Sequence, residues 1–145
     1  MKFKMLVFVS VLYFSLFSVN LQAQIIGKIF SKSEANTLFG AVIESKDISV
    51  SELKTLVGLT SKYVMFSIKN GAVAIKGDDG KLIYNSGIAL AERDVFKKYS
   101  KSMVLDLLFL STSGIIAVEN RGKVITLTTG EVTLELSLDC PPYCN

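Results

Sequence analysis

Residues 49–77 read SVSELKTLVGLTSKYVMFSIKNGAVAIKG, and residues 100–128 read SKSMVLDLLFLSTSGIIAVENRGKVITLT. The two stretches align without a gap at a spacing of 51 positions, and six of the 29 aligned pairs are identical. Both keep one order of parts: a serine start, an apolar helix, a strand, a glycine turn and a second strand. Self-similarity at a fixed spacing indicates an internal repeat. The sequence therefore predicts two copies of one unit, over residues 49–85 and 100–138.

Each unit is expected to be a helix followed by a three-stranded antiparallel meander. In the first, Ser49 and Glu52 have the spacing of a helix-capping box. Apolar residues at i, i+3 and i+4 then mark one helical stripe, and Asn70-Gly71 is a two-residue hairpin signal. The apolar stripe is Leu53, Leu56 and Val57. The three expected strands cover residues 63–69, 72–76 and 81–85.

The second unit repeats this pattern with a more apolar helix. Ser100 and Ser102 stand at its start, and apolar residues surround it on all sides, so it is expected to be the more deeply buried helix. Residues 131–138 alternate apolar and polar side chains, which is typical of one continuous, half-buried strand. The apolar residues of the expected helix are Val104, Leu105, Leu107, Leu108, Phe109 and Leu110. The three expected strands cover residues 115–119, 123–128 and 131–138.

Two shorter helices are expected ahead of the units. Ser31 and Glu34 again have the capping-box spacing, with Gly40 as the stop. A second short helix is expected over residues 92–99, with Val95, Phe96 and Tyr99 as its apolar contacts. One unit cannot bury its apolar face alone. The expected fold is therefore α+β, with two tandem helix-plus-meander units packed as one domain over residues 24–145, in one sheet or in two.

The first 23 residues have the order of a secretory signal peptide. Lys2 and Lys4 precede a 15-residue run rich in Leu, Val and Phe, which is shorter than the roughly 20 residues that span a bilayer. Cleavage is expected between Ala23 and Gln24. The protein is then periplasmic or secreted, with no transmembrane anchor after cleavage.

The charges and residue types exclude several classes of function. Without the two leader lysines, the 16 basic residues become 14, against 13 acidic residues, which does not indicate a nucleic-acid partner. The chain has no histidine, which excludes Ser-His-Asp and Cys-His catalysis and histidine metal sites. It also lacks the common glycine-rich nucleotide-binding loops. No cofactor and no metal is expected.

The most distinctive motif is Cys140-Pro141-Pro142-Tyr143-Cys144. In an exported chain with two cysteines, a small disulfide-closed loop at Cys140 and Cys144 is the favoured interpretation. A redox-active pair is the alternative, although the spacing is not C-x-x-C and the prolines prevent the helix start that lowers a thiol pKa.

Other candidates for chemistry have more ordinary interpretations. Ser31-Lys32-Ser33 and Ser100-Lys101-Ser102 hold the ingredients of a lysine-assisted nucleophile, but serines at helix starts are usually caps. Lys97, Lys98, Tyr99 and Lys101 form a small basic cluster, a candidate contact for an anionic glycan, a lipid head group or a partner, but a solvated helix face is the favoured interpretation.

Acidic residues offer the remaining enzymatic route. Asp78 and Asp79 are expected in a turn, and Glu119, Glu131 and Glu135 are expected to face solvent. Paired carboxylates in one cleft would instead indicate a hydrolase.

The chain resembles a group of small exported proteins of unassigned function from Bacteroidetes-type bacteria, which end in C-P-P-x-C. The marks are Ala23-Gln24, the segment Phe96…Tyr99-Ser100-Lys101-Ser102, Glu119-Asn120-Arg121-Gly122 and the terminal C-P-P-Y-C. The resemblance implies a bacterial source and export, and it implies no catalytic residues.

The first functional hypothesis is an exported, non-enzymatic binding or structural module whose ligand sits between its two halves. Its partner would be an envelope protein, a glycan or a small ligand. The alternatives are a carboxylate-dependent hydrolase and a thiol–disulfide redox protein that uses Cys140 and Cys144.

Overall fold

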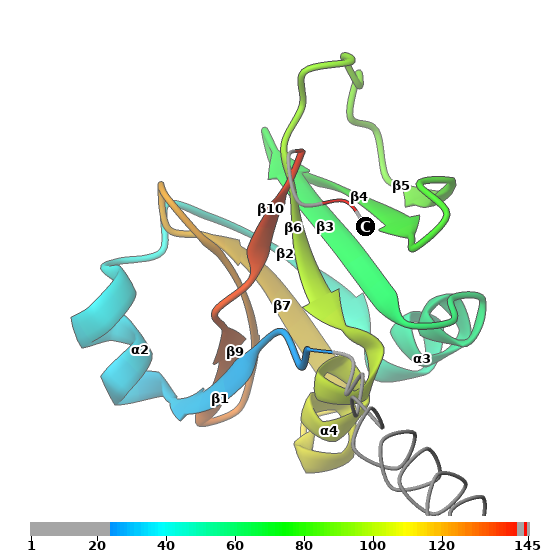
Figure 1. Ribbon diagram of the computed structural model, residues 1–145. Coiled ribbons are helices and arrows are strands. Elements are labelled where there is room, and N and C mark those ends of the chain that lie inside the picture. Colours follow the sequence, from blue (N-terminus) through cyan, green and yellow to red (C-terminus); the bar gives the residue numbers. More distant parts are fainter. Residues whose placement is uncertain (1–23, 142–143, 145) are drawn as a thin grey trace, which may run out of the picture.

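A computed structural model describes residues 24–141 and residue 144. Within these residues the chain is α+β, with three helices and ten strands in two five-stranded antiparallel sheets (Figure 1). The predicted fold class is confirmed, and the predicted leader lies outside the described residues. No helix in the described part of the chain combines the length and the apolar character that crossing a bilayer requires.

The first sheet has the order β1-β9-β8-β7-β2 and the second has the order β10-β6-β3-β4-β5. The strands of the first sheet are β1 (Lys28–Ser31), β9 (Val132–Glu135), β8 (Ile125–Thr129), β7 (Ile115–Asn120) and β2 (Glu44–Ser49). The strands of the second are β10 (Leu138–Cys140), β6 (Phe96–Ser100), β3 (Tyr63–Lys69), β4 (Ala72–Gly77) and β5 (Leu82–Asn85). The helices are α2 (Lys32–Phe39), α3 (Val50–Gly58) and α4 (Lys101–Leu110).

Each sheet holds three strands that follow one another in the chain. Strands β3, β4 and β5 pair consecutively in the second sheet, and β7, β8 and β9 pair consecutively in the first. The strand ahead of each helix joins the opposite meander: β2 pairs with β7, and β6 pairs with β3. These crossed pairings hold both sheets to one core.

Helices α2 and α3 each begin at a serine whose side chain caps the helix. Ser31 Oγ accepts the N–H of Glu34 at 3.2 Å, and the Glu34 carboxylate accepts the N–H of Ser31 at 2.9 Å, so the predicted capping box is confirmed. Ser49 Oγ accepts the N–H of Glu52 at 3.1 Å. Ser100 is the N-cap residue of α4, but its Oγ accepts the N–H of Ile26 at 2.7 Å and does not cap the helix.

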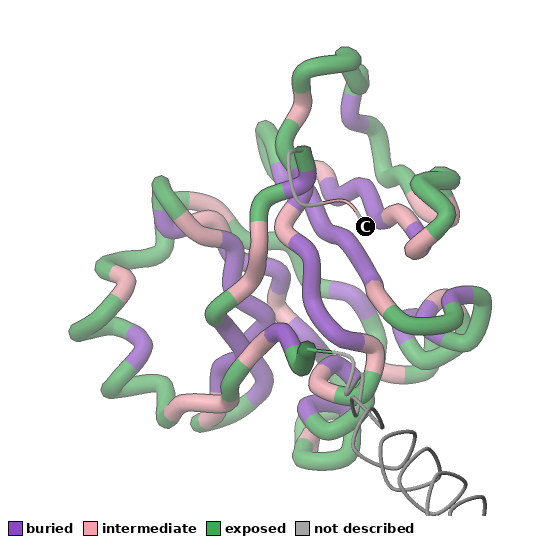
Figure 2. Tube along the Cα trace, viewed as in Figure 1, coloured by how far each residue is buried: buried purple, intermediate pink, exposed green. Residues whose placement is uncertain are grey.

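The core lies between the sheets and the inner faces of α3 and α4, as the buried segments in Figure 2 show. Phe66 of β3 and Tyr99 of β6 are fully buried and meet edge to face, with ring centroids 6.0 Å apart. The turn between β3 and β4 has φ of 53° at Asn70 and 72° at Gly71, as expected for the Asn-Gly hairpin.

Helix α4, which was expected to be the more deeply buried helix, has three buried residues against two in α3, but its apolar residues are not buried on every side. Val104, Leu107 and Leu108 are buried, but Phe109 is 91% exposed. Leu105 and Leu110 are 37% and 47% exposed. Helix α4 therefore keeps an apolar outer face that nothing in the described chain covers.

The prediction of a helix over residues 92–99 is wrong. The segment ends in strand β6, which pairs with β3 on one side and with β10 on the other. Val95, Phe96 and Tyr99 fit a helical spacing, but the backbone pairing on both edges satisfies more hydrogen bonds than an isolated short helix would.

The predicted continuous strand over residues 131–138 is broken. Strand β9 ends at Glu135, Leu136 has φ of 69°, and β10 continues in the other sheet. The Glu135 carboxylate accepts the backbone N–H groups of Leu136 and Ser137, which turns the chain away from the first sheet. Glu135 is therefore buried, and the expectation that it faces solvent is wrong.

Candidate functional site

A cavity of about 370 Å³ lies on the outer face of the second sheet, opposite the main core. Its walls include Met65 of β3, Phe96 of β6 and the disulfide-bonded Cys140. These three side chains belong to a small apolar cluster that is separate from the main core. The strand alternation explains this position, because Met65 points away from the face that carries Val64 and Phe66.

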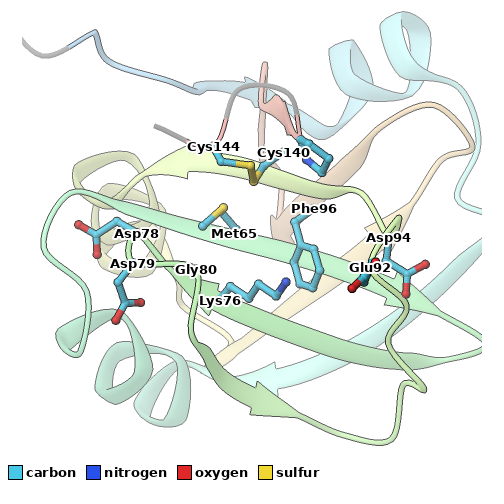
Figure 3. Close-up of a pocket in the computed structure, with 11 residues that line it drawn as sticks. Met65, Lys76, Asp78, Asp79, Gly80, Glu92, Asp94, Phe96, Cys140 and Cys144 are labelled. Carbon is cyan, nitrogen blue, oxygen red and sulfur yellow. A yellow bond between two sulfur atoms is a disulfide. The ribbon is translucent and has the colours of Figure 1, made fainter.

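Charged residues stand at the two ends of this cavity. Figure 3 shows Asp78 and Asp79 at one end and Glu92 and Asp94 at the other, with Lys76 and Phe96 nearer the second pair. The two acidic pairs come from different connections, the turn after β4 and the loop between β5 and β6. Acidic residues therefore line the cavity at both of its ends.

At the first end, Asp78 connects the turn after β4 to the segment that precedes β3. Its two carboxylate oxygens accept the backbone N–H groups of Ser61 and Lys62 at 3.1 and 3.0 Å. Burial alone would raise the pKa of Asp78, but these hydrogen bonds outweigh it and hold the pKa below its usual value. Asp79 accepts the N–H of Lys81 at 3.0 Å. Both aspartates lie in the predicted turn, but only Asp79 makes a local bond of the expected kind, because Asp78 bonds to a distant segment.

At the second end, Asp94 accepts the backbone N–H of Ala91 at 2.7 Å, which closes a tight turn in the loop. Glu92 is exposed and lines the cavity without a hydrogen bond of this kind. The Lys76 ammonium lies 4.3 Å from the centroid of the Phe96 ring, a cation–π distance. The second end therefore offers one carboxylate whose oxygens are open to a ligand.

Cys140 and Cys144 form a disulfide, and both residues line the cavity. Cys140 and Cys144 thus lie beside the cavity on the outer face of the second sheet (Figure 3). A disulfide is compatible with an oxidising compartment outside the cytosol. Pro142 and Tyr143 of the same motif lie outside the described residues.

The predicted basic cluster does not form one surface, because β6 sends alternate side chains to opposite faces. Tyr99 is fully buried, and its hydroxyl donates to the Ile125 carbonyl. Burial raises the pKa of Tyr99 well above its ordinary value. Lys97 pairs with Asp139, and Lys101 donates to the Thr60 carbonyl at 2.7 Å.

Lys98 is 2% exposed, and its ammonium lies 4.7 Å from the Tyr63 ring centroid. Burial lowers the pKa of Lys98 below its usual value. The sequence predicted that these lysines lie on a solvated helix face, but residues 96–100 form strand β6, so that helix face does not exist. The serine–lysine pairs carry no arrangement for nucleophilic attack either, since Ser31 and Ser100 are bonded to backbone or cap partners.

A smaller cavity of about 290 Å³ lies where the two sheets meet, between the end of β3 and the turn from β7 to β8. It is lined by Lys97, Lys123 and Asp139 among others. This is the junction where the sequence hypothesis expects a ligand. Lys97 and Asp139 already bind each other there, so this cavity offers less free charge than the one beside the disulfide.

Sequence reasoning missed a buried polar network on the first sheet. Arg121 donates to Glu119 at 2.8 Å, to Thr126 at 3.0 Å, and to Asn36 and the Gly40 carbonyl of α2 at 2.7 and 2.6 Å. The expectation that Glu119 faces solvent is wrong, because its side chain is 9% exposed. The available signal was the alternation of threonines with Leu127 in β8, which predicts one polar face.

This network attaches α2 to the first sheet and is fully satisfied. Thr126 and Thr128 also donate to the Glu119 carboxylate, at 2.9 and 2.8 Å. Among the described residues, no buried side-chain nitrogen or oxygen lacks a hydrogen-bond partner. The role of the network is therefore structural. Likewise, the described part of the chain holds no group of three or more metal-ligating side chains that could bind an ion.

Glu135 gives a prediction about pH. Burial raises the pKa of its carboxyl, and the hydrogen bonds from Ser137 offset that only in part. A carboxyl with a higher pKa in the folded state binds more protons there, so its contribution to stability falls as pH rises above about 4.3, the unfolded value. Relative to the wild type, Glu135→Gln should gain stability as the pH rises above about 4.3.

Denaturant unfolding of both proteins across that range measures the difference between their free energies of unfolding. Glu34, Glu44 and Asp78 have lowered pKa values and contribute in the opposite sense, but they are present in both proteins, so their contributions cancel in this difference. A difference that stays constant with pH would contradict the raised pKa of Glu135.

Comparisons with known proteins found no matching family model, no matching curated protein and no matching solved structure.

Proposed function

We propose that this protein is an exported, non-enzymatic binding module that holds a small ligand in the cavity beside Cys140 and Cys144. The cavity itself carries the proposal: at about 370 Å³ it has the size of a small-molecule site, with apolar walls and a few charged groups. The disulfide and the order of residues 1–23 support export.

The internal duplication is part of the same proposal. We infer that residues 49–85 and 100–138 are copies of one unit, on the support of the aligned sequences and the matching order of strand, helix and meander. The first copy supplies part of the cavity lining, from Met65 to Gly80, and the rest comes from residues 92–96 between the copies and from Cys140, Pro141 and Cys144 after the second.

The lining indicates the ligand class. Four acidic residues, Asp78, Asp79, Glu92 and Asp94, line the cavity together with one lysine, Lys76, and Asp79 also pairs with Lys81 at 3.5 Å. Met65 and Phe96 supply apolar contact. A small cation with an apolar body, such as an aryl amine, fits this combination because its ring packs on Phe96 while its ammonium meets an acidic end.

The positions of the carboxylates favour binding over hydrolysis. Asp78 and Asp94 use their oxygens to hold backbone N–H groups, and the acidic pairs stand at opposite ends of the cavity (Figure 3). A general acid–base pair needs two carboxyl groups directed at one bond. A hydrolase remains the alternative, and measured turnover of any glycoside or ester by the purified protein would favour it.

The test compares phenethylamine with phenylacetate, which has a similar body and the opposite charge. Isothermal titration should show binding of the amine alone, and Glu92→Gln should weaken it about fivefold, the size of one exposed charge pair of about 1 kcal/mol. Glu131→Gln is the matched control, since Glu131 is an exposed glutamate in the other sheet. Equal affinity for both probes, or no binding of the amine, would contradict the proposal.

A further inference from the structure

The outer face of α4 carries an apolar stripe with one acidic residue. Ser102, Leu105, Asp106 and Phe109 are all exposed and recur at helical spacing, so they share one face. Phe109 is 91% exposed, the largest exposed fraction among the large apolar side chains of the described residues. An exposed aromatic ring at the end of such a stripe is typical of an interaction surface.

A cavity of about 340 Å³ opens at the N-terminal end of the same face. Leu105 and Ser102 line it from α4, Ile25 lines it from the start of the described chain, and Tyr63 lines it from β3. Its lining is mainly apolar, and a void of about 150 Å³ is enough to hold a benzene molecule. The cavity can therefore take a phenyl ring.

Along the axis of α4, the Phe109 ring and the residues at the N-terminal end of the cavity lie on opposite sides of Leu105. Phe109 lies four residues after Leu105 and Lys101 lies four residues before it, so each stands about 6 Å from Leu105 along the helix axis. If two copies of α4 cross in antiparallel orientation at Leu105, the Phe109 ring of each copy meets the cavity of the other. A surface of this kind is self-complementary about a two-fold axis.

The charges agree with this arrangement. Lys62 and Lys101 stand at the cavity, and Lys101 is already bonded to the Thr60 carbonyl. Asp106 lies one turn before Phe109, so in the antiparallel pair it approaches the Lys62 of the other copy. An anionic lipid surface would instead meet the Asp106 carboxylate at the centre of the patch, and a flat surface would leave the cavity unfilled.

We propose that this face of α4 is the interface of a two-fold homodimer, in which Phe109 of each copy fills the cavity beside Ser102 and Tyr63 of the other. One helix pair with its flanking residues buries less than the roughly 800 Å² per partner of a standard interface. The dimer is accordingly weak, with a dissociation constant in the micromolar range or above. This interface shares no lining residue with the cavity beside the disulfide.

The experiment is sedimentation equilibrium of the protein expressed as the full chain and recovered after export, between about 1 µM and 1 mM. The expected result is a monomer–dimer equilibrium that Phe109→Ser weakens at least tenfold. Ile43→Ser is the matched control, because Ile43 is 70% exposed and lies away from α4, beside Gly122. It should leave the equilibrium unchanged.

A charge exchange distinguishes the proposed pairing from a general loss of apolar surface. Asp106→Lys should weaken the dimer, and adding Lys62→Asp should restore it, since the pair is re-formed with opposite signs. A protein that stays monomeric throughout, or a dimer that Phe109→Ser leaves unchanged, would overturn the proposal. So would a monomer that binds phosphatidylcholine vesicles through Phe109, which would assign the face to a membrane.

Discussion

Replacing Arg121 by methionine is expected to lower the free energy of unfolding by about 3–5 kcal/mol, because it leaves a buried carboxylate without its cation. The guanidinium is fully buried and donates to Glu119, Thr126, Asn36 and the Gly40 carbonyl. Methionine fills a similar volume but restores none of these bonds. Guanidinium unfolding of the full chain, followed by far-ultraviolet circular dichroism, measures the loss.

Arg93 provides the control, since it is the other arginine of the chain and it is exposed. Arg93→Met should change stability by less than about 0.5 kcal/mol. The double variant Glu119→Gln with Arg121→Met should be more stable than Arg121→Met alone, because it removes the unpaired charge. If Arg121→Met unfolds at the wild-type denaturant concentration, the network does not hold α2 to the first sheet.

Phe66→Ala should cost about 3–5 kcal/mol, because it opens a cavity at the point where the sheets are packed together. Phe66 is fully buried, and its ring contacts the Tyr99 ring edge to face. Since β3 and β6 also pair through their backbones, the loss should weaken the crossed pairing that links the two meanders. Thermal unfolding at low protein concentration tests this expectation.

Phe109→Ala is the matched control for Phe66→Ala. The same side chain is removed, but from a site that is 91% exposed, so the stability of the monomer should change by less than about 0.5 kcal/mol. Equal losses from the two substitutions would mean that burial between the sheets is not what makes Phe66 important.

Local signals predicted several features of this protein correctly. The capping box at Ser31 and the turn at Asn70-Gly71 depend on neighbouring residues alone, so short sequence patterns were enough. The strand over residues 63–69 followed from its alternation, and the cysteine pair followed from there being two cysteines in the chain.

The candidate site was not visible in the sequence. Asp78 and Glu92 are 14 residues apart, and Phe96 was expected on a helix. These residues meet at one cavity because β4 and β6 flank β3 in the same sheet, and no local pattern reports which strands become neighbours. Glu119 and Glu135 were misjudged for a related reason, since burial depends on what covers a strand face.

The sequence by itself determined the caps of α2 and α3, the hairpin turn, the α+β class and the cysteine pair, because each of these depends on residues close together in the chain. Only the tertiary structure decided that residues 96–100 form a strand, that β9 and β10 part at Leu136, and that Arg121 fastens α2 to the first sheet. The physical reason is that backbone pairing and charge burial are settled between segments far apart in the chain, where the free energy of contact outweighs local preference.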